Sequence, residues 1–228
     1  VKRRLGELSA KYAERFLFLT EELDHGNNVG FPDVAIKVCM APRSLVDSAA
    51  FTEKQKKYLK TEAISMKKVK HQYMCHCKDH FFANGDIAFF IVMDYMEGTD
   101  IKTELQGSAA GMTEAQTIHL GLNVTSALSA LHDAHILHRD IKPANIMLVD
   151  TESAGRVAKL IDFGNAKFSM LASTAGGEAM LQNTMDTTTS STMRSPQYMS
   201  PEQLEGLELN AQTDLWSLGV TLFEMLTK

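Results

Sequence analysis

The sequence predicts an α+β fold in which a small, mostly β first part precedes a mostly helical second part. In the first part, residues 34–40 (VAIKVCM) and 87–93 (IAFFIVM) are short, apolar and rich in β-branched or aromatic residues, which is typical of buried strands. In the second part, residues 112–134 and 210–227 have apolar residues at helical spacing. The periodicity changes near Gly98, where we expect the boundary between the two parts.

The composition is that of an ordinary globular protein, with 228 residues, 44% apolar and 22% charged. A net charge of −5 argues against a broad surface for nucleic acid or anionic lipid. The longest apolar run, residues 87–93, is too short to cross a bilayer, and no secretory signal pattern opens the chain. Because the first residue is Val1, we expect an excised domain or a processed fragment. Three cysteines do not form a disulfide framework, so we expect a reducing, cytoplasmic location.

Residues 71–80 concentrate histidine and cysteine and raise the possibility of a zinc site. The alternative is a strand in which Cys75, Cys77 and Asp79 face one way while the residues between them face the other. Residues two apart on a strand do not form a compact tetrahedral site, and the chain has no second cysteine pair. The strand interpretation is therefore favoured.

The first part is expected to contain strands, one helix and turns. Residues 12–40 predict strands joined by a turn, and strands are expected at 73–82 and 87–95 around the turn ANGD. Residues 51–70 have helical spacing, and the apolar stripe of that helix is predicted to be Tyr58, Ala63, Met66 and Val69.

The second part is expected to contain two strong helices separated by short apolar runs and a long loop. Thr113 followed by Gln116 predicts a capping box at the start of the first helix. Its apolar face is predicted to be Leu120, Val124, Ala127, Leu128 and Leu131, and that of the second helix Leu215, Leu218, Leu222 and Met225. Residues 168–195 are rich in Ser, Thr, Met, Gly and Ala and predict a mobile loop.

The densest group of chemically capable residues is HRDIKPAN at 138–145, followed by DFG at 162–164. Phosphoryl transfer requires a carboxylate that orients the attacking hydroxyl, oxygen ligands for Mg²⁺ and cations near the phosphates. Asp140 can be that carboxylate, and Asn145 and Asp162 can supply the oxygen ligands. Lys37 and Lys142 can neutralise phosphate oxygens. Singly, such residues are more often caps and turn formers, but their joint spacing favours the catalytic interpretation.

These motifs, in this order, resemble those of the eukaryotic-type (Hanks-type) serine/threonine protein kinases. The resemblance covers nearly the whole chain and rests on VAIK at 34–37, HRDIKPAN at 138–145, DFG at 162–164, SPE at 200–202 and DLWSLG at 214–219. It implies a bilobal protein-kinase-like fold with an N-lobe at 1–97, a partial C-lobe at 98–228 and an activation segment at 162–202. It also implies transfer of the γ-phosphoryl group of ATP to Ser or Thr of protein substrates, with Mg²⁺ or Mn²⁺.

The resemblance further implies roles for single residues around the phosphates. Lys37 would bind the α and β phosphates and pair with Glu62, with Glu53 as the second candidate. Asp140 would be the catalytic base, with Lys142 beside it. The metal ligands would be Asn145 and Asp162.

The remaining implied roles concern the adenine ring and the loop around Asp140. Ala35 and Met147 would lie on the two faces of the adenine. The hinge would run from Asp94 to Met96, with Met93 as gatekeeper. Ser195 would contact Asp140 and Lys142, and Asp214 would hold the backbone of the HRD loop. His138 and Trp216 are expected to be structural.

The glycine-rich loop that covers the phosphates in this family is degenerate here. Its best match is residues 5–13, with Gly6 at the first glycine, Leu8 and Lys11 at the second and third, and Ala13 at the position that covers adenine. Side chains keep a backbone farther from phosphate than glycine does, so weaker ATP binding is expected. An active kinase is favoured. The alternatives are a pseudokinase that serves as a scaffold or allosteric partner, and a metal-binding module built on residues 71–80.

The activation segment carries the expected regulatory position. Arg139 before Asp140 is typical of kinases that are activated by phosphorylation of this segment, because an arginine can bind the added phosphate through two hydrogen bonds. Our hypothesis is that one or more residues from Thr187 to Thr192 are phosphorylated, with the protein itself as a candidate kinase for this step. The alternative is a solvated linker rich in hydroxyl groups.

In the family, the large lobe continues past the helix expected at 210–227 and supplies an arginine that pairs with the glutamate of SPE. Glu202 is therefore expected to lack that partner. The helix at 210–227 is expected to be incompletely covered, so that the 228 residues alone would be unstable or poorly active.

Overall fold

The computed structural model describes residues 3–10, 13–21, 33–41, 50–83, 85–162, 167–168 and 195–228, with side chains described at 34–41, 50–53, 55–83, 85–162 and 195–228. The chain forms two compact units. Unit 1 comprises Val1–Lys70 and Cys75–Glu97, and unit 2 comprises His71–Met74 and Gly98–Lys228. The division at Gly98 coincides with the change of periodicity in the sequence, whereas the segment 71–74 belongs to unit 2.

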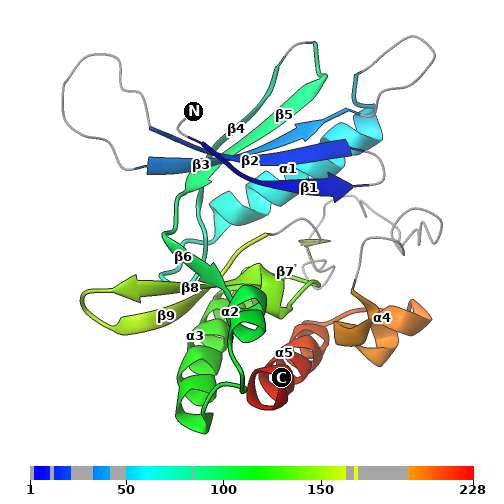
Figure 1. Ribbon diagram of the computed structural model, residues 1–228. Coiled ribbons are helices and arrows are strands. Elements are labelled where there is room, and N and C mark those ends of the chain that lie inside the picture. The colour runs from blue at the N-terminus through cyan, green and yellow to red at the C-terminus, as the bar shows by residue number, and fades with distance from the viewer. Residues whose placement is uncertain are drawn as a thin grey trace. The chain divides into compact units, whose positions relative to one another are not determined.

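Unit 1 is a five-stranded antiparallel sheet with one helix (Figure 1). Its strands, in spatial order, are β1 (Arg3–Ala10), β2 (Ala13–Glu21), β3 (Asp33–Met40), β5 (Ala88–Asp94) and β4 (Cys77–Ala83). The β-branched and aromatic residues of β3 and β5 form the core, with Val34, Phe89 and Ile91 almost completely buried. The expected strands are present, and β1 is an addition to them.

Helix α1 (Glu53–Lys68) begins at a capping box formed by Thr52 and Gln55. Its buried stripe is Leu59, Glu62, Ala63 and Met66, continued by Val69 just after the helix. The predicted stripe was wrong in one position, because Tyr58 is 41% exposed. Leu59 takes that place because positions 59, 62, 63 and 66 share one helix face, and Tyr58 lies about 100° away from it.

The predicted strand at 73–82 begins later than expected and is irregular. Strand β4 pairs with β5 through a register shift between Cys77 and Asp79. Cys77 is completely buried, whereas the Asp79 side chain is 66% exposed. The expectation that both face the same way was therefore wrong, because a β-bulge places an extra residue on one strand and interrupts the alternation.

Unit 2 combines a three-stranded sheet of order β6-β8-β9 with helices and a small two-stranded pair. In chain order its elements are β6 (Gly98–Asp100), α2 (Ile101–Gly107), α3 (Glu114–Asp133), β7 (Ile136–Leu137), η1 (Pro143–Asn145), β8 (Ile146–Thr151), β9 (Gly155–Leu160), β10 (Lys167–Phe168), η3 (Pro196–Tyr198), α4 (Pro201–Glu205) and α5 (Ala211–Thr227). Helices α3 and α5 pack against each other (Figure 1).

Helix α3 confirms the sequence prediction in detail. The capping box of Thr113 and Gln116 is present at its start. All five residues of the predicted apolar face are buried, including Ala127 and Leu131 at 0% exposure. The same face carries Gly121, whose missing side chain leaves room for Leu222 of α5.

Helix α5 buries a face that is more polar than predicted. Leu218 and Met225 are buried, as expected, and Leu222 is half-buried. Leu215 is 47% exposed, so its predicted burial was wrong. The buried positions near the start of the helix are Thr213, Asp214 and Ser217, which make hydrogen bonds that an apolar face could not make. Within the described part of the chain, no helix is long and apolar enough to span a membrane.

Gly98 allows strand β6 to approach β8 closely, and a substitution there is expected to be costly. A Cβ at this position would lie 2.0 Å from the carbonyl oxygen of Leu148, which is backbone and cannot rotate away. Gly98→Ala is therefore expected to destabilise the protein by about 1–3 kcal/mol. Gly107→Ala is the matched control, because a Cβ there meets nothing within 4 Å. Chemical unfolding would contradict this explanation if the two variants were equally stable.

Candidate active site

Unit 1 contains a buried ion pair between Lys37 and Glu62. Lys37 lies in the middle of β3, opposite Leu17 of β2 and Ile91 of β5. Its Nζ is 2.5 Å from Oε1 of Glu62 on α1, and the two residues are only 4% and 2% exposed. The other candidate, Glu53, instead contacts Lys56 at the surface. The pairing fixes the position of the Lys37 ammonium, which is the arrangement that a phosphate-binding lysine requires.

Breaking this pair is expected to have separate effects on stability and on nucleotide binding. Lys37→Met should cost about 3–5 kcal/mol of unfolding free energy, because it leaves the Glu62 carboxylate buried without its counter-charge. The double variant Lys37→Met with Glu62→Leu should recover most of that stability, since no uncompensated charge remains. Both variants should lose affinity for ATP, measured by titration with a fluorescent ATP analogue.

Lys56→Met is the matched control, because Lys56 lies near the surface and pairs with Glu53 and Asp86. It should leave stability and ATP affinity close to those of the original protein. A double variant that binds ATP like the original would show that Lys37 does not contact the nucleotide.

The residues predicted to surround the adenine divide between the two units. In unit 1, Ala35 is 6% exposed on β3 and pairs with Met93 of β5. Asp94 ends β5, and its backbone amide donates to the carbonyl of His76 at 3.1 Å. Met96 is half-buried shortly after the strand. In unit 2, Met147 is half-buried on β8, on the face opposite to Leu148.

The degenerate glycine-rich segment forms part of the strand pair β1–β2. Gly6 lies within β1 opposite Leu17, next to an irregularity in the register after Arg4. Ala13 begins β2 and pairs with Ala10 at the end of β1. Lys11 lies outside the described residues.

In unit 2, the predicted catalytic residues Lys142 and Asn145 both contact the third one, Asp140. The Lys142 ammonium is 2.9 Å from Asp140 Oδ2. The Asn145 Nδ2 donates to the Asp140 backbone carbonyl at 2.8 Å and to Oδ2 at 2.9 Å. The side chains of Asp140 and Lys142 are 12% and 17% exposed. This leaves a partly accessible carboxylate with a fixed orientation and a cation beside it.

The orientation of Asn145 also fits metal binding. Because Nδ2 lies against two oxygens of Asp140, Oδ1 must point away from them. The Asn145 carbonyl accepts the backbone amide of Ile161 at 3.0 Å, which holds the residue before Asp162 beside the loop. Asp162 itself has φ +59, an uncommon conformation for a non-glycine residue. An amide oxygen and a carboxylate are the hard ligands that Mg²⁺ prefers, so the residues present fit the ion.

The backbone of the HRD loop is held by the buried carboxylate of Asp214. Asp214 is 0% exposed and accepts the amides of His138 at 2.9 Å and Arg139 at 2.7 Å. Its Oδ2 also lies 2.8 Å from His132 Nε2, at the end of α3. These contacts stabilise a loop in which Arg139 has φ +66. The predicted anchoring role of Asp214 is confirmed, whereas His132 was not predicted.

The end of the segment 162–202, together with Gln203 just after it, packs next to this loop. Ser195 and Tyr198 line a small cavity of about 10 Å³ together with Arg139 and Asp140. The Gln203 amide donates to the Arg139 carbonyl at 3.2 Å. The positions Thr187 to Thr192, and the phosphosite hypothesis with them, lie outside the described residues.

Two further hydrogen bonds join this region to α5. Tyr198 Oη donates to Glu224 at 2.6 Å, and burial together with this bond raises the pKa of Tyr198 to about 12. Glu202, expected to lack an arginine partner, accepts the Thr213 hydroxyl at 2.6 Å, which lowers the pKa of its carboxyl group. Sequence patterns do not predict these contacts, because each joins side chains of two different elements that have no characteristic spacing.

The cysteines of residues 71–80 are buried thiols. Cys77 donates to the Asp79 carbonyl at 3.3 Å, and burial raises the pKa of its thiol to about 11. A thiol with so high a pKa is a poor thiolate ligand at neutral pH. Among the residues with described positions, no group of three or more His, Cys, Asp or Glu side chains is arranged to hold a metal ion.

Comparison with known proteins adds a family and named relatives. The model of the protein kinase domain matches residues 34–228. A probable serine/threonine-protein kinase nek2 of Dictyostelium discoideum is 33% identical over 77% of this chain and 39% of its own length. The serine/threonine-protein kinase pkn3 of Myxococcus xanthus is 35% identical over 62% and 24%, and the human serine/threonine-protein kinase Nek5 is 34% identical over 76% and 22%.

The chain therefore spans between about a fifth and two fifths of the length of these curated relatives. The match begins at β3 and includes the ion pair, the HRD loop and α5. It confirms both the predicted α+β fold class and the resemblance described from the motifs. The chain belongs to the protein kinase domain family.

Proposed function

We propose that this domain transfers the γ-phosphoryl group of ATP to serine or threonine hydroxyls of protein substrates. The observation that carries the proposal is the arrangement around Asp140, where Lys142 and the Asn145 amide hold one carboxylate oxygen from two sides. A loop residue with a merely structural role would not need a partly accessible carboxylate held in this way. The names of the relatives, all serine/threonine-protein kinases, support the choice of acceptor.

In the proposed mechanism, each residue of the loop has a distinct task. Asp140 Oδ1 or Oδ2 accepts the proton of the attacking hydroxyl as the new O–P bond forms and the bond to ADP breaks. Lys142 neutralises charge on the transferred phosphoryl group. Asn145 Oδ1 and the Asp162 carboxylate would hold the divalent cation, which would supply charge neutralisation at the phosphates. Lys37, fixed by Glu62, binds the α and β phosphates.

In unit 1, we assign Ala35 to a face of the adenine ring and the backbone groups of Asp94 and Met96 to its edge. In unit 2, we assign Met147 to a face of the ring. Gly6 and Ala13 cover the nucleotide. The cation is Mg²⁺, with Mn²⁺ as a substitute of similar coordination chemistry.

Two further parts of the proposal concern regulation and location. Phosphorylation at one or more of Thr187 to Thr192 activates the domain, in part through Arg139. The domain acts in the cytoplasm, where a reducing environment keeps thiols free. Cys39, Cys75 and Cys77 are buried cysteines.

The second candidate function is that of a pseudokinase, and one observation favours it. Leu8 lies within β1 at a position that would carry the second glycine of the loop. A side chain there hinders close approach of the backbone to phosphate. Such a protein would keep the fold and bind partners without transferring phosphate.

Transfer of labelled phosphate from Mg·ATP to a generic basic protein tests the proposal. Phosphoamino-acid analysis should find phosphoserine or phosphothreonine, and removal of the divalent cation should abolish transfer. Binding of ATP without any transfer, with the protein folded and the activation segment phosphorylated, would favour the pseudokinase. Transfer that persists without a divalent cation would contradict the roles given to Asn145 and Asp162.

A further inference from the structure

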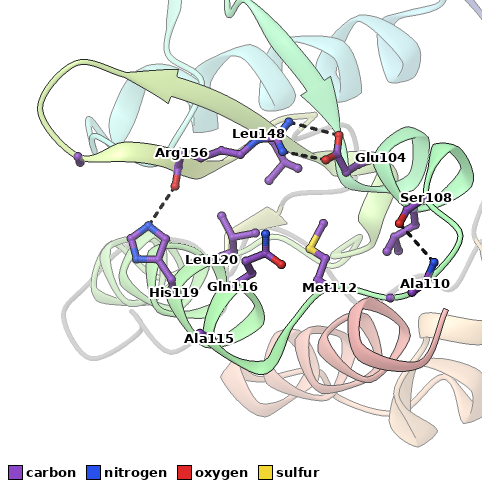
Figure 2. Close-up of a pocket in the computed structure, with 13 residues that line it drawn as sticks. Glu104, Ser108, Ala110, Met112, Ala115, Gln116, His119, Leu120, Leu148 and Arg156 are labelled. Carbon is purple, nitrogen blue, oxygen red and sulfur yellow. Dashed lines mark hydrogen bonds and ion pairs between the residues drawn. The ribbon is translucent and has the colours of Figure 1, made fainter.

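Unit 2 contains a groove of about 460 Å³ that is separate from the HRD loop (Figure 2). Its walls come from α2, the loop between α2 and α3, the first turns of α3, strand β8 and the turn between β8 and β9. None of the residues around Asp140 lines it. Its volume falls within the range of sites that hold small molecules.

The floor of the groove is apolar. Leu105, Leu120 and Leu148 line it and are only 4%, 5% and 2% exposed. Figure 2 shows Leu120, Leu148 and Met112 around the same space, although they come from α3, β8 and the α2–α3 loop. A flexible, polarisable methionine at such a position adapts to ligands of different shape. An apolar ligand would therefore remove apolar surface from water on several sides.

The charged side chains at the rim of the groove form an ion pair with each other. Arg156 Nη1 and Nη2 donate to the two carboxylate oxygens of Glu104 at 2.8 and 3.3 Å. The Arg156 carbonyl contacts His119 Nε2 at 3.0 Å. A charged ligand would gain an ion pair at this exposed rim only by displacing one of these contacts, which offsets the gain. The rim therefore favours an uncharged occupant.

Gln116, an exposed residue that lines the groove, offers a polar group to a ligand. Gln116 Oε1 accepts both the amide and the hydroxyl of Thr113 in the capping box, at 2.9 Å each. The capping box holds the Gln116 side chain through its oxygen. The two N–H groups on Nε2 can therefore donate to another partner. Figure 2 shows this amide between Leu120 and Met112. It can donate a hydrogen bond to one acceptor on a molecule in the groove.

We propose that this groove binds an uncharged, mostly apolar small molecule that carries one hydrogen-bond acceptor. The apolar floor supplies the affinity, the Gln116 amide orients the ligand, and the neutralised rim excludes ions. None of the residues proposed to bind the nucleotide or to carry out transfer lines the groove, and the proposal does not depend on that activity.

Three naphthalene derivatives of nearly equal shape test this chemistry on the complete chain: the neutral ketone acetonaphthone, the anion naphthoate and the cation naphthylethylammonium. The isotope-labelled methyl group of Met112 reports binding by NMR, with its signal assigned through Met112→Leu. Acetonaphthone should shift this signal saturably and bind about tenfold or more tightly than either ion. Gln116→Ala should weaken its binding about fivefold, the loss of one hydrogen bond. Equal affinities for all three probes, or no saturable shift of Met112, would overturn the proposal.

Two tryptophan variants in the α2–α3 loop localise the site. Ala110 and Ala109 are both exposed neighbours, but only Ala110 lines the groove. Ala110→Trp should fill the groove and reduce acetonaphthone binding at least about tenfold, whereas Ala109→Trp should leave it unchanged. Equal effects of the two variants would show that the probe binds elsewhere. If a variant fails to fold, the comparison of the three probes on the original protein still tests the proposal.

Discussion

Asp140→Asn is expected to lower the rate of phosphoryl transfer by roughly 10²–10⁴-fold, the usual contribution of a general base. The amide keeps the size of the side chain but cannot accept the proton of the attacking hydroxyl. In the original protein, Lys142 and the Asn145 amide both donate to one oxygen of the Asp140 carboxylate. In the variant, they would face either an NH₂ group or an amide oxygen, which is a weaker acceptor than a carboxylate. ATP affinity should change little, since Asp140 is not among the proposed nucleotide contacts. Single-turnover transfer and ATP titration measure the two effects separately.

Asp133→Asn is the control for this prediction. Asp133 is an exposed aspartate at the end of α3, so the same chemical change there should leave transfer intact. If Asp140→Asn transferred phosphate at the original rate, the assignment of Asp140 as base would be wrong. If both the original protein and the variant were inactive while binding ATP, the pseudokinase would be the better interpretation.

Asp214→Ala is expected to lower both stability and activity, although Asp214 contacts no substrate. The substitution removes the acceptor of the His138 and Arg139 amides, and each buried amide left unpaired costs about 1–3 kcal/mol. The uncommon backbone conformation of Arg139 then loses its support. The loop that presents Asp140 should become mobile. Hydrogen exchange at the amides of His138 and Arg139 should therefore accelerate strongly.

Asp150→Ala provides the comparison, because the Asp150 side chain is 84% exposed. Its effect on exchange in the HRD loop should be negligible. Asp214→Ala with unchanged exchange and unchanged transfer would show that the loop holds its shape without the Asp214 carboxylate. Faster exchange with full transfer would show that the order of the loop is not needed for catalysis.

The motif residues could be predicted because they act within short segments. HRDIKPAN contains Asp140, Lys142 and Asn145 within six positions, and the loop brings all three together. The α3 face could be predicted for a similar reason, since one helical period governs all its residues. The choice of Glu62 over Glu53 as the contact of Lys37 also agrees with the structure.

The errors arose where a buried position is polar or where the period is interrupted. In α1 the buried face includes the charged Glu62, which pairs with Lys37, and the prediction placed Tyr58 on that face instead of its neighbour Leu59. In β4 a bulge reverses the alternation after Cys77. In α5 the buried positions are filled by hydrogen-bonding side chains, and Leu215 is exposed. Each outcome depends on a partner from another segment of the chain.

The contacts of Asp214 have a consequence for the folding of the protein. This one carboxylate contacts His132, His138 and Arg139, which are 82, 76 and 75 residues away in the sequence. Closing loops of that length is slow and occurs only when the helices that flank them have docked. A nascent or partly unfolded chain can thus form α3 and the local turns of the loop while Asp140 is still unconstrained. The active arrangement of the loop would then form late in folding. An incompletely folded chain is expected to be inactive rather than weakly active.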